Sequence, residues 1–283
     1  MQVFSTPEPL KSYISNNRKH GKTVGLVPTM GALHQGHLEL IGSSRQSNDI
    51  TVCSIYVNPA QFNNQRDLIE YPRDLKQDLK KLKALDCQAV FCPTDDVMYP
   101  GEPVLSMDFG HLEKIMEGSH RPGHFKGVAL VVSKLFHMVQ PDTAYFGEKD
   151  WQQLVIIKRL VEDLNFPLEI VSMPVIREAD GLAMSSRNAR LTPQQRGVAN
   201  ELHRTLLLVK QQIENTTAIE MALKLGKQYL DRVPLITMEY LEVVRAYSLD
   251  HPVEELGREP LSICIAALLG DVRLIDNVQV FNE

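Results

Sequence analysis

The stretch Pro28-Thr29-Met30-Gly31-Ala32-Leu33-His34-Gln35-Gly36-His37, called the histidine turn below, decides how this sequence is interpreted. A short apolar run, Thr23 to Val27, precedes it and is typical of a buried strand. Apolar residues at helical spacing begin at Leu38. The order of strand, glycine-bearing turn and helix start offers free backbone N–H groups and the positive end of a helix dipole. Both features suit a phosphate group.

Two histidines in this turn, His34 and His37, are three residues apart. If Gly36 opens the helix, both imidazoles point toward the same phosphate. A plain loop with two surface histidines and turn-forming glycines fits the decapeptide equally well, because glycine turns are common. The neighbouring parts of the chain must therefore decide between the two interpretations.

Length and composition place the chain among globular proteins. Its 283 residues suffice for one large or two modest domains, and 43% hydrophobic with 23% charged residues is ordinary for a soluble protein. A net charge of −5 argues against general affinity for nucleic acid or an anionic membrane. There is no run of about 18 apolar residues, and the N-terminus lacks a signal-peptide pattern.

The cysteines Cys53, Cys87, Cys92 and Cys264 form no Cys-x-x-Cys pair and no small-domain disulfide framework. A reducing cytoplasmic location is therefore expected. The histidines of the turn lack carboxylate or thiolate companions at ligand spacing, so no protein-bound metal is expected. Any Mg²⁺ is expected to arrive with a nucleotide.

Apolar segments of strand and helix type alternate through the first 180 residues. We predict strands at 23–27, 50–57, 89–92, 143–146 and 168–171, and a further strand at 104–109. We predict helices at 7–20, 74–86, 123–139 and 150–164, the second of them with its lysines on a solvated face. The alternation favours an α/β fold with a Rossmann-like, doubly wound parallel sheet.

The pattern changes after Asn188. Thr192-Pro193 is a good helix start, and we expect one helix from there to about Ile213 and another over 218–233. Strands are expected at 238–244, 261–268 and 272–275. We therefore expect a nucleotide- and substrate-binding domain over residues 1–180 and a small α+β lid domain over 181–283.

Three predicted strands end in polar, chemically useful residues. The histidine turn, Asn58–Gln61 and Gly147–Asp150 each begin at the carboxyl end of a strand. Ligands of parallel sheets bind at that edge, so the three segments are expected to face one crevice. In the last segment, Lys149 suits a phosphate, whereas Asp150 suits either a ribose hydroxyl or a helix N-cap.

The predicted domain junction holds a second set of phosphate-binding groups. Gly181 permits a tight turn, and Met184-Ser185-Ser186-Arg187 supplies two hydroxyls and a guanidinium. Taken alone, this segment is better explained by a solvated turn between domains, and only together with the histidine turn does it favour phosphate binding. The basic cluster Arg121 to Lys126 is equally consistent with polyphosphate binding and with an exposed loop.

Several segments together resemble one family. His-x-Gly-His after the first strand resembles the first motif of the nucleotidyl-transfer superfamily that includes class I aminoacyl-tRNA synthetases, and 184–187 resembles their Lys-Met-Ser-Lys-Ser loop. The full histidine turn is more similar to the pantothenate synthetase (pantoate–β-alanine ligase) family. Further matching stretches are Tyr56–Phe62, Tyr71–Arg73, Phe146–Gln153 and Arg177–Asn188. The resemblance runs from about residue 20 to the C-terminus and is most specific up to residue 195.

The resemblance implies an ATP-dependent ligase that joins pantoate to β-alanine through a pantoyl adenylate and releases AMP and pyrophosphate. It also implies a homodimer. Gln61 and Gln153 would bind pantoate, and Gln61 would also lie beside β-alanine. Electrostatic catalysis would fall to His34, His37, Lys149, Ser185, Ser186 and Arg187. The implied ATP site comprises Met30, Gly31, Ala32, Leu33, His34, Gln35, Gly36, His37, Gly147, Glu148, Lys149, Asp150, Ile176, Met184, Ser185, Ser186 and Arg187.

Two other functions share parts of this pattern. A nucleotidylyltransferase would use the same histidine turn, but its phosphorylated substrate would favour cations where this chain has the neutral Gln61 and Gln153. A nucleotide-sensing module would bind ATP without releasing pyrophosphate. A tRNA synthetase is disfavoured, because the chain has no basic anticodon-binding region.

Overall fold

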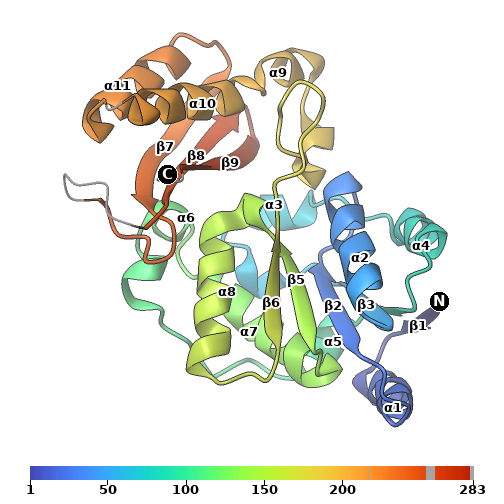
Figure 1. Cartoon of the computed structure of the whole chain (residues 1–283). Coiled ribbons are helices and arrows are strands. Elements are labelled where there is room, and N and C mark those ends of the chain that lie inside the picture. The colour runs from blue at the N-terminus through green and yellow to red at the C-terminus, as the bar shows by residue number, and fades with distance from the viewer. Residues whose placement is uncertain (216, 253–258, 281–283) are drawn as a thin grey trace.

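The computed structural model describes residues 1–215, 217–252 and 259–280. Its larger part is a six-stranded, wholly parallel sheet in the order β1-β4-β3-β2-β5-β6 (Figure 1). The strands are β1 (Gln2–Phe4), β2 (Val24–Thr29), β3 (Ile50–Ile55), β4 (Ala89–Phe91), β5 (Thr143–Gly147) and β6 (Glu169–Met173). The expected doubly wound α/β sheet is confirmed, with β1 as an added edge strand that the sequence pattern did not indicate.

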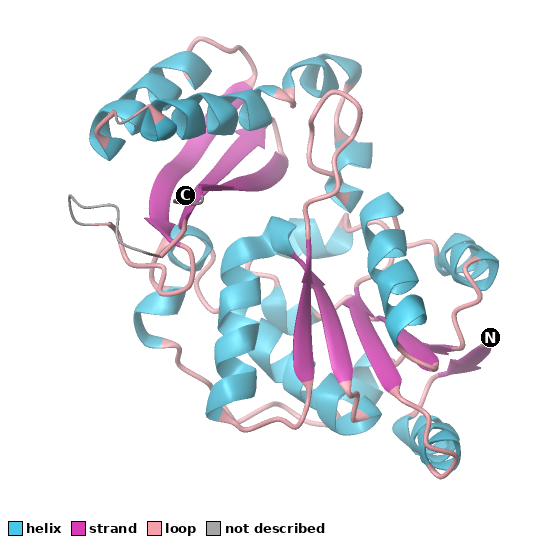
Figure 2. Cartoon of the chain, in the orientation of Figure 1, coloured by secondary structure: helices cyan, strands magenta, loops and turns pink. Residues whose placement is uncertain are grey.

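Helices cover both faces of this sheet (Figure 2). On one face, α1 (Pro7–Arg18), α7 (His124–Val139) and α8 (Trp151–Asp163) bury their apolar sides in the main core. On the other, α2 (Gln35–Ser47) and α4 (Leu75–Ala84) enclose a smaller core. Burial on both faces explains why the central strands are continuous apolar runs. The shorter segments are α3 (Gln65–Ile69), α5 (Asp95–Met98), α6 (Met116–His120), η1 (Pro59–Gln61), η2 (Gly110–Glu113), η3 (Glu148–Asp150) and η4 (Ser186–Arg190).

The strand order reverses beside β2. The chain moves from β2 outward through β3 to β4, then returns to place β5 on the other side of β2. At such a switch point the loops that leave the two central strands diverge and open a crevice. The histidine turn leaves β2 and the Gly147–Asp150 turn leaves β5, so both lie at this crevice.

A three-stranded antiparallel sheet follows, built from β7 (Ile236–Arg245), β8 (Leu261–Leu269) and β9 (Val272–Val280). The preceding helices are α9 (Pro193–Val198), α10 (Glu201–Glu214) and α11 (Ile219–Leu230). Successive residues of β8 point to opposite faces of this sheet. Ile263 and Ile265 belong to the core formed with α10 and α11, whereas Cys264 and Ala266 belong to the core of the parallel sheet. The small sheet is therefore buried on both faces and joined to the rest of the chain by shared packing.

Two secondary-structure predictions are wrong. Residues 104–109 form no strand, and Val104 is fully exposed. The outer edge of β4, where this segment would have to pair, is occupied by β1. The single helix expected from Thr192 to Ile213 is two helices, because α9 ends at Val198 after Gly197 and α10 begins at Glu201. Among the described residues, no helix combines the length and hydropathy needed to cross a membrane.

Candidate active site

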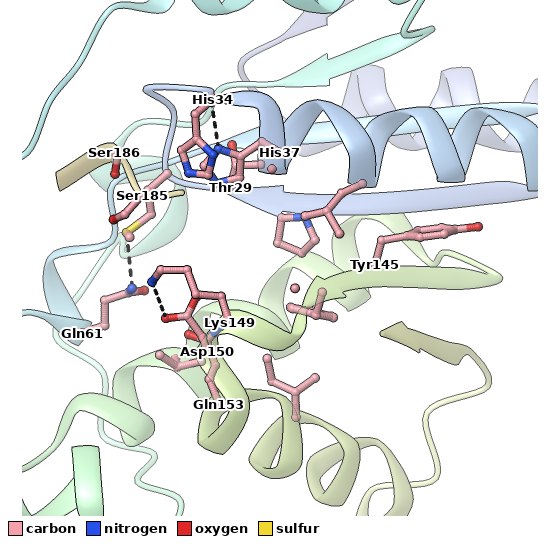
Figure 3. Close-up of a pocket in the computed structure, with 18 of the residues that line it drawn as sticks. Thr29, His34, His37, Gln61, Tyr145, Lys149, Asp150, Gln153, Ser185 and Ser186 are labelled. Carbon is pink, nitrogen blue, oxygen red and sulfur yellow. Dashed lines mark hydrogen bonds and ion pairs between the residues drawn. The ribbon is translucent and has the colours of Figure 1, made fainter. Parts of the chain in front are cut away.

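One cavity lies at the carboxyl ends of the central strands (Figure 3). Its wall is formed by the histidine turn, η1, the Gly147–Asp150 turn and the 184–187 segment, the last of which lies between β6 and α9 in the chain. The convergence expected from the sequence is thus present. Of the residues proposed for ATP and substrates, those lining the cavity are Met30, His34, Gly36, His37, Gln61, Gly147, Lys149, Asp150, Gln153, Ile176, Met184, Ser185, Ser186 and Arg187.

The remaining proposed ATP residues do not line the cavity. Leu33 is buried in the smaller core and Gln35 donates to Glu39 on the surface. Gly31 and Ala32 form the bend of the histidine turn, with φ angles of +79° and +48°. Glu148 is not part of the cavity lining, whereas its neighbours Gly147 and Lys149 are. These residues shape the turns that carry the cavity-lining side chains.

The histidine turn is held from outside by α4. The buried Asp78 carboxylate accepts the N–H groups of Ala32 at 2.9 Å and Leu33 at 2.8 Å. Lys81 donates to the Leu33 carbonyl at 2.5 Å. The lysines of this helix are exposed, as expected, and Lys81 combines that exposure with a hydrogen bond to the histidine turn. Sequence reasoning missed both residues, because helical periodicity does not say which charged side chain faces a neighbouring loop.

The two imidazoles lie side by side, with ring centroids 4.0 Å apart. The backbone N–H of His34 donates to Nδ1 of His37 at 3.4 Å, so Nε2 of His37 carries the proton of the neutral ring. A Cβ at Gly36 would lie 3.0 Å from the His34 ring, so a larger residue there would press on this imidazole.

Both histidines are neutral N–H donors near pH 7. Burial, reinforced by the ammonium of Lys149, lowers the pKa of His34 to about 4. Burial and the neighbouring His34 lower the pKa of His37 well below its usual value. Each neutral imidazole keeps one ring N–H, which can donate a hydrogen bond to a phosphate oxygen.

A second donor comes from the turn after β5. Lys149 extends into the cavity, and its Nζ lies 3.8 Å from the Asp150 carboxylate (Figure 3). Asp150 directly precedes α8, but its side chain makes no capping hydrogen bond. The N-cap interpretation of Asp150 therefore lacks support, and its carboxylate is available to the cavity.

Gln61 is buried in the wall that η1 contributes to the cavity. Its side-chain amide donates toward the Met30 sulfur at 3.3 Å, and its Oε1 accepts from Asn58 at 3.0 Å. The close packing of η1 on α7 requires Gly127, where a Cβ would meet the Ala60 carbonyl oxygen at 2.2 Å. These contacts fix Gln61 in a single position.

Gln152 and Gln153 have different surroundings despite being neighbours. Gln152 is buried outside the main cavity, donates to the Leu112 and Ile115 carbonyls at 2.7 and 3.0 Å, and accepts the Glu117 N–H. Gln153 faces the cavity, as Figure 3 shows. Gln153, the glutamine expected to bind pantoate, is therefore the one whose side chain faces the cavity.

The basic cluster at the start of α7 contributes two side chains to the cavity, although Pro122 and Gly123 within it are exposed. Arg121 and His124 both line the cavity, and His124 Nδ1 donates to the Gln61 carbonyl at 2.8 Å. Arg121 lies 3.2 Å from His124 Nε2. Burial, followed by the charge of Arg121, lowers the pKa of His124 to about 3.

The 184–187 segment contacts α3 and the loop that follows it. Ser186 Oγ lies 3.0 Å from the Tyr71 hydroxyl, and the Arg187 guanidinium lies over the Tyr71 ring. Ser185 accepts the N–H of Arg187 with its hydroxyl at 3.2 Å. The sequence indicated hydroxyls and a cation here but gave no sign of what holds them.

No cluster of three or more metal-ligating side chains occurs within residues 1–215, 217–252 and 259–280. The cavity lining instead combines three neutral imidazoles, one lysine and two arginines with three primary amides. Such a set suits a polyphosphate beside a small polar substrate.

Comparison with known proteins agrees with this geometry. The family model for pantoate–β-alanine ligase matches residues 2–279. The chain belongs to the pantoate–β-alanine ligase family. The pantothenate synthetases of Cytophaga hutchinsonii and Porphyromonas gingivalis W83 are each 44% identical to it, with 99% of both chains covered.

Solved structures of the family share the whole fold. Pantothenate synthetase from Thermus thermophilus is 40% identical, with a TM-score of 0.93 over all of both chains. The Francisella tularensis pantoate–β-alanine ligase, complexed with β,γ-ATP and β-alanine, is 33% identical and has a TM-score of 0.80, with 98% of this chain and 97% of that chain covered. The family, fold and ligase activity expected from the sequence are confirmed.

Proposed function

We propose that this ligase activates pantoate with ATP in the cavity described above and then transfers the pantoyl group to β-alanine. The observation that carries the proposal is the meeting of the histidine turn, Lys149 and the 184–187 segment around one cavity that also contains Gln61 and Gln153. Phosphate-binding groups and hydroxy-acid-binding groups then lie within reach of one reacting carboxylate.

In the first step, a pantoate carboxylate oxygen attacks the α-phosphorus of ATP. A new P–O bond forms, the bond to the β-phosphate oxygen breaks, and pyrophosphate leaves with that electron pair. Negative charge grows on the phosphate oxygens, where the N–H groups of His34 and His37 and the cations of Lys149 and Arg187 would stabilise it. Ser185 and Ser186 would add hydroxyl donors. No covalent bond to the enzyme is needed.

In the second step, the neutral amine of β-alanine attacks the acyl carbon of the adenylate. The C–O bond to AMP breaks, AMP leaves with the electron pair, and the nitrogen loses a proton to water to give the amide. Gln61 would hold the pantoyl group and lie beside β-alanine, while Gln153 would bind the pantoate hydroxyl. The apolar side chains of Val128, Val131 and Val132 line the same cavity and suit the two methyl groups of pantoate.

The donor set also fits ATP carrying Mg²⁺. Glu39 and Asp150 are the acidic members of the described cavity lining, and most polar groups there are able to donate hydrogen bonds to a phosphate. Such a site suits an ion held chiefly by phosphate oxygens. When bound, Mg²⁺ would neutralise part of the charge on the leaving pyrophosphate.

We also propose a cytoplasmic homodimer whose chains divide into the domains 1–180 and 181–283. The four free cysteines support a reducing compartment. Val104 and Leu105 expose apolar side chains in an extended segment, which supports a contact with a second chain. The proposed domain boundary falls in the segment that links β6, the last strand of the parallel sheet, to α9, the first of the helices that precede the antiparallel sheet. This position supports the boundary.

Isotope labelling tests the route. With pantoate labelled by ¹⁸O in its carboxylate, attack on the α-phosphorus leaves one label in AMP once β-alanine displaces it. Attack on the γ-phosphorus would instead leave label in inorganic phosphate and give ADP. Omitting pantoate, ATP or β-alanine in turn identifies which substrates pyrophosphate release requires. Label in phosphate would overturn the proposed mechanism, and ATP binding without pyrophosphate release would favour a nucleotide sensor.

A further inference from the structure

The turn that carries Lys149 is held by a residue distant in sequence. Asn277 lies on β9, in the antiparallel C-terminal sheet, and is 3% exposed. Its side-chain Nδ2 donates to the carbonyl oxygens of Glu148 at 2.8 Å and Lys149 at 2.9 Å. A primary amide has two N–H donors, and here each has its own acceptor. The peptide from which the Lys149 side chain projects is thus fixed by two hydrogen bonds.

Asn277 is itself rigidly anchored. Its backbone N–H donates to the Asp276 carboxylate at 2.7 Å. That carboxylate is held by a bidentate ion pair with Arg177, at 2.6 and 3.0 Å. Arg177 also donates to the backbone carbonyls of Gly181 and Asn277 at 3.0 and 3.1 Å. The Asn277 amide therefore has little freedom to follow a displaced turn.

The same anchor reaches the other phosphate-binding segment. Arg177 pairs with Ala183 in an isolated bridge, and Ala183 directly precedes the segment that carries Ser185 and Arg187. Two adjacent residues of β9 thus connect to both turns that we assign to the ATP phosphates. If the two sheets only packed against each other, a pair of apolar side chains would serve as well at this contact. Mere packing therefore does not require a buried amide whose donors each meet a loop carbonyl.

We propose that Asn277 is a positioning residue for ATP activation: it sets the place of the Lys149 ammonium over the phosphates through the Glu148 and Lys149 carbonyls. The proposal rests on the proposed role of Lys149. Asn277 itself touches no substrate. Its contribution is expected mainly in adenylate formation, because Lys149 is assigned to charge that develops on the phosphates in that step.

A double-mutant cycle separates positioning from support of the fold. Lys149→Ala removes the ammonium but keeps the backbone carbonyl, so the hydrogen bonds from Asn277 remain. Asn277→Ala should slow single-turnover pyrophosphate release roughly tenfold or more in the wild-type background, since small misplacements of a catalytic group are costly. In the Lys149→Ala background the same change should slow it less than about twofold, because no ammonium remains to misplace.

Stability and specificity controls complete the test. The loss of melting temperature caused by Asn277→Ala should be similar in both backgrounds, because the broken hydrogen bonds are the same. Asn277→Asp keeps the shape but replaces the donors by oxygen, so it should be at least as slow as Asn277→Ala. Thr205→Val removes a buried hydrogen bond within α10, between Thr205 and the Glu201 carbonyl, and should leave pyrophosphate release unchanged.

The outcomes are distinct. Equal slowing by Asn277→Ala in both backgrounds would overturn the positioning role and leave the ligase mechanism intact. Normal pyrophosphate release by Lys149→Ala itself would remove Lys149 from the proposed mechanism and would overturn the positioning role with it. Attack by β-alanine on isolated pantoyl adenylate should be nearly unaffected by Asn277→Ala. A matching loss in both half-reactions would also contradict the proposal.

Discussion

The guanidinium of Arg187 is ion-paired with the carboxylate of Asp67 across 2.7 Å. Arg187 belongs to the segment that we assign to the ATP phosphates, whereas Asp67 lies on the short helix α3. Arg190 meets the same carboxylate at 3.0 Å. Despite burial, which raises it, the pKa of Asp67 is lowered by these arginines, with Arg187 the largest contributor, so the carboxylate is charged at neutral pH. A phosphate that binds Arg187 must compete with it.

Neutralising Asp67 should therefore tighten ATP binding. Asp67→Asn keeps the shape of the side chain but weakens its hold on Arg187, and we expect KM for ATP to fall by up to about fivefold, the scale of a partly exposed ion pair. Glu70→Gln is the matched control, because Glu70 pairs with Arg66 and Arg190 and leaves Arg187 untouched. A raised KM in Asp67→Asn would mean that Asp67 orients Arg187 for phosphate binding.

Removing the cation itself should affect one half-reaction. Arg187→Ala should slow adenylate formation from ATP and pantoate and leave the attack of β-alanine on preformed adenylate nearly unchanged, because phosphate charge grows chiefly in the first step. Single-turnover measurements of each step test this expectation. Equal slowing of both steps would instead indicate that the segment serves to hold the two sheets together.

His37 is expected to act in the transition state. With its Nδ1 engaged by the His34 N–H, its Nε2–H is left to donate to a phosphate oxygen. His37→Ala should lower kcat by about 10²–10³, the usual effect of losing one preorganised donor, with folding intact. Steady-state kinetics and circular dichroism measure the two parts of this expectation. The exposed His20→Ala serves as control, and near wild-type activity in His37→Ala would refute the assignment.

The adjacent glutamines offer a matched pair. Gln153→Ala should raise KM for pantoate far more than KM for ATP, because its side chain faces the cavity as an uncharged amide suited to a hydroxy acid. Gln152→Ala breaks three hydrogen bonds to backbone groups, so it should lower the melting temperature without a selective change in either KM. If ATP binding suffers most in Gln153→Ala, the glutamine belongs to the nucleotide site.

The sequence predicted those parts of the site that are local in the chain. The histidine turn and Gly147–Asp150 each combine a strand end, a glycine and a donor within a few residues, and parallel strands bring such ends together. That Arg121 and His124 line the cavity is visible only in the structure, where His124 donates to the Gln61 carbonyl. Short-range pattern does not reveal which long-range contact a polar side chain will make.

The supporting residues could not be predicted for the same reason. Asp78 appears in the sequence as one more charge on an amphipathic helix, and Asn277 as one polar residue in a strand. Their functions depend on packing between elements far apart in the chain. The wrongly expected strand at 104–109 has the same origin, because strand formation needs a free neighbouring edge as well as a suitable sequence.

The buried His124 should make the stability of the enzyme depend on pH. Its folded-state pKa is about 3, lowered by burial and by Arg121, against about 6.5 for an exposed histidine. In the unfolded chain His124 therefore binds a proton as pH falls through about 6.5, whereas in the folded protein it stays neutral until about pH 3. The unfolded state gains protons first, so the stabilising contribution is present above about pH 6.5 and is lost as pH falls.

Urea unfolding at pH 7, 6, 5.5 and 5 measures this contribution. His124→Gln removes the titration, so the loss of unfolding free energy between pH 6 and 5 should be smaller than in the wild type by up to about 1.4 kcal/mol per pH unit, the value for one proton. His34 and His37 also have lowered pKa values and leave a residual slope in the variant. The exposed His20→Gln should follow the wild type. Parallel curves for His124→Gln and the wild type would mean that His124 binds its proton alike in both states.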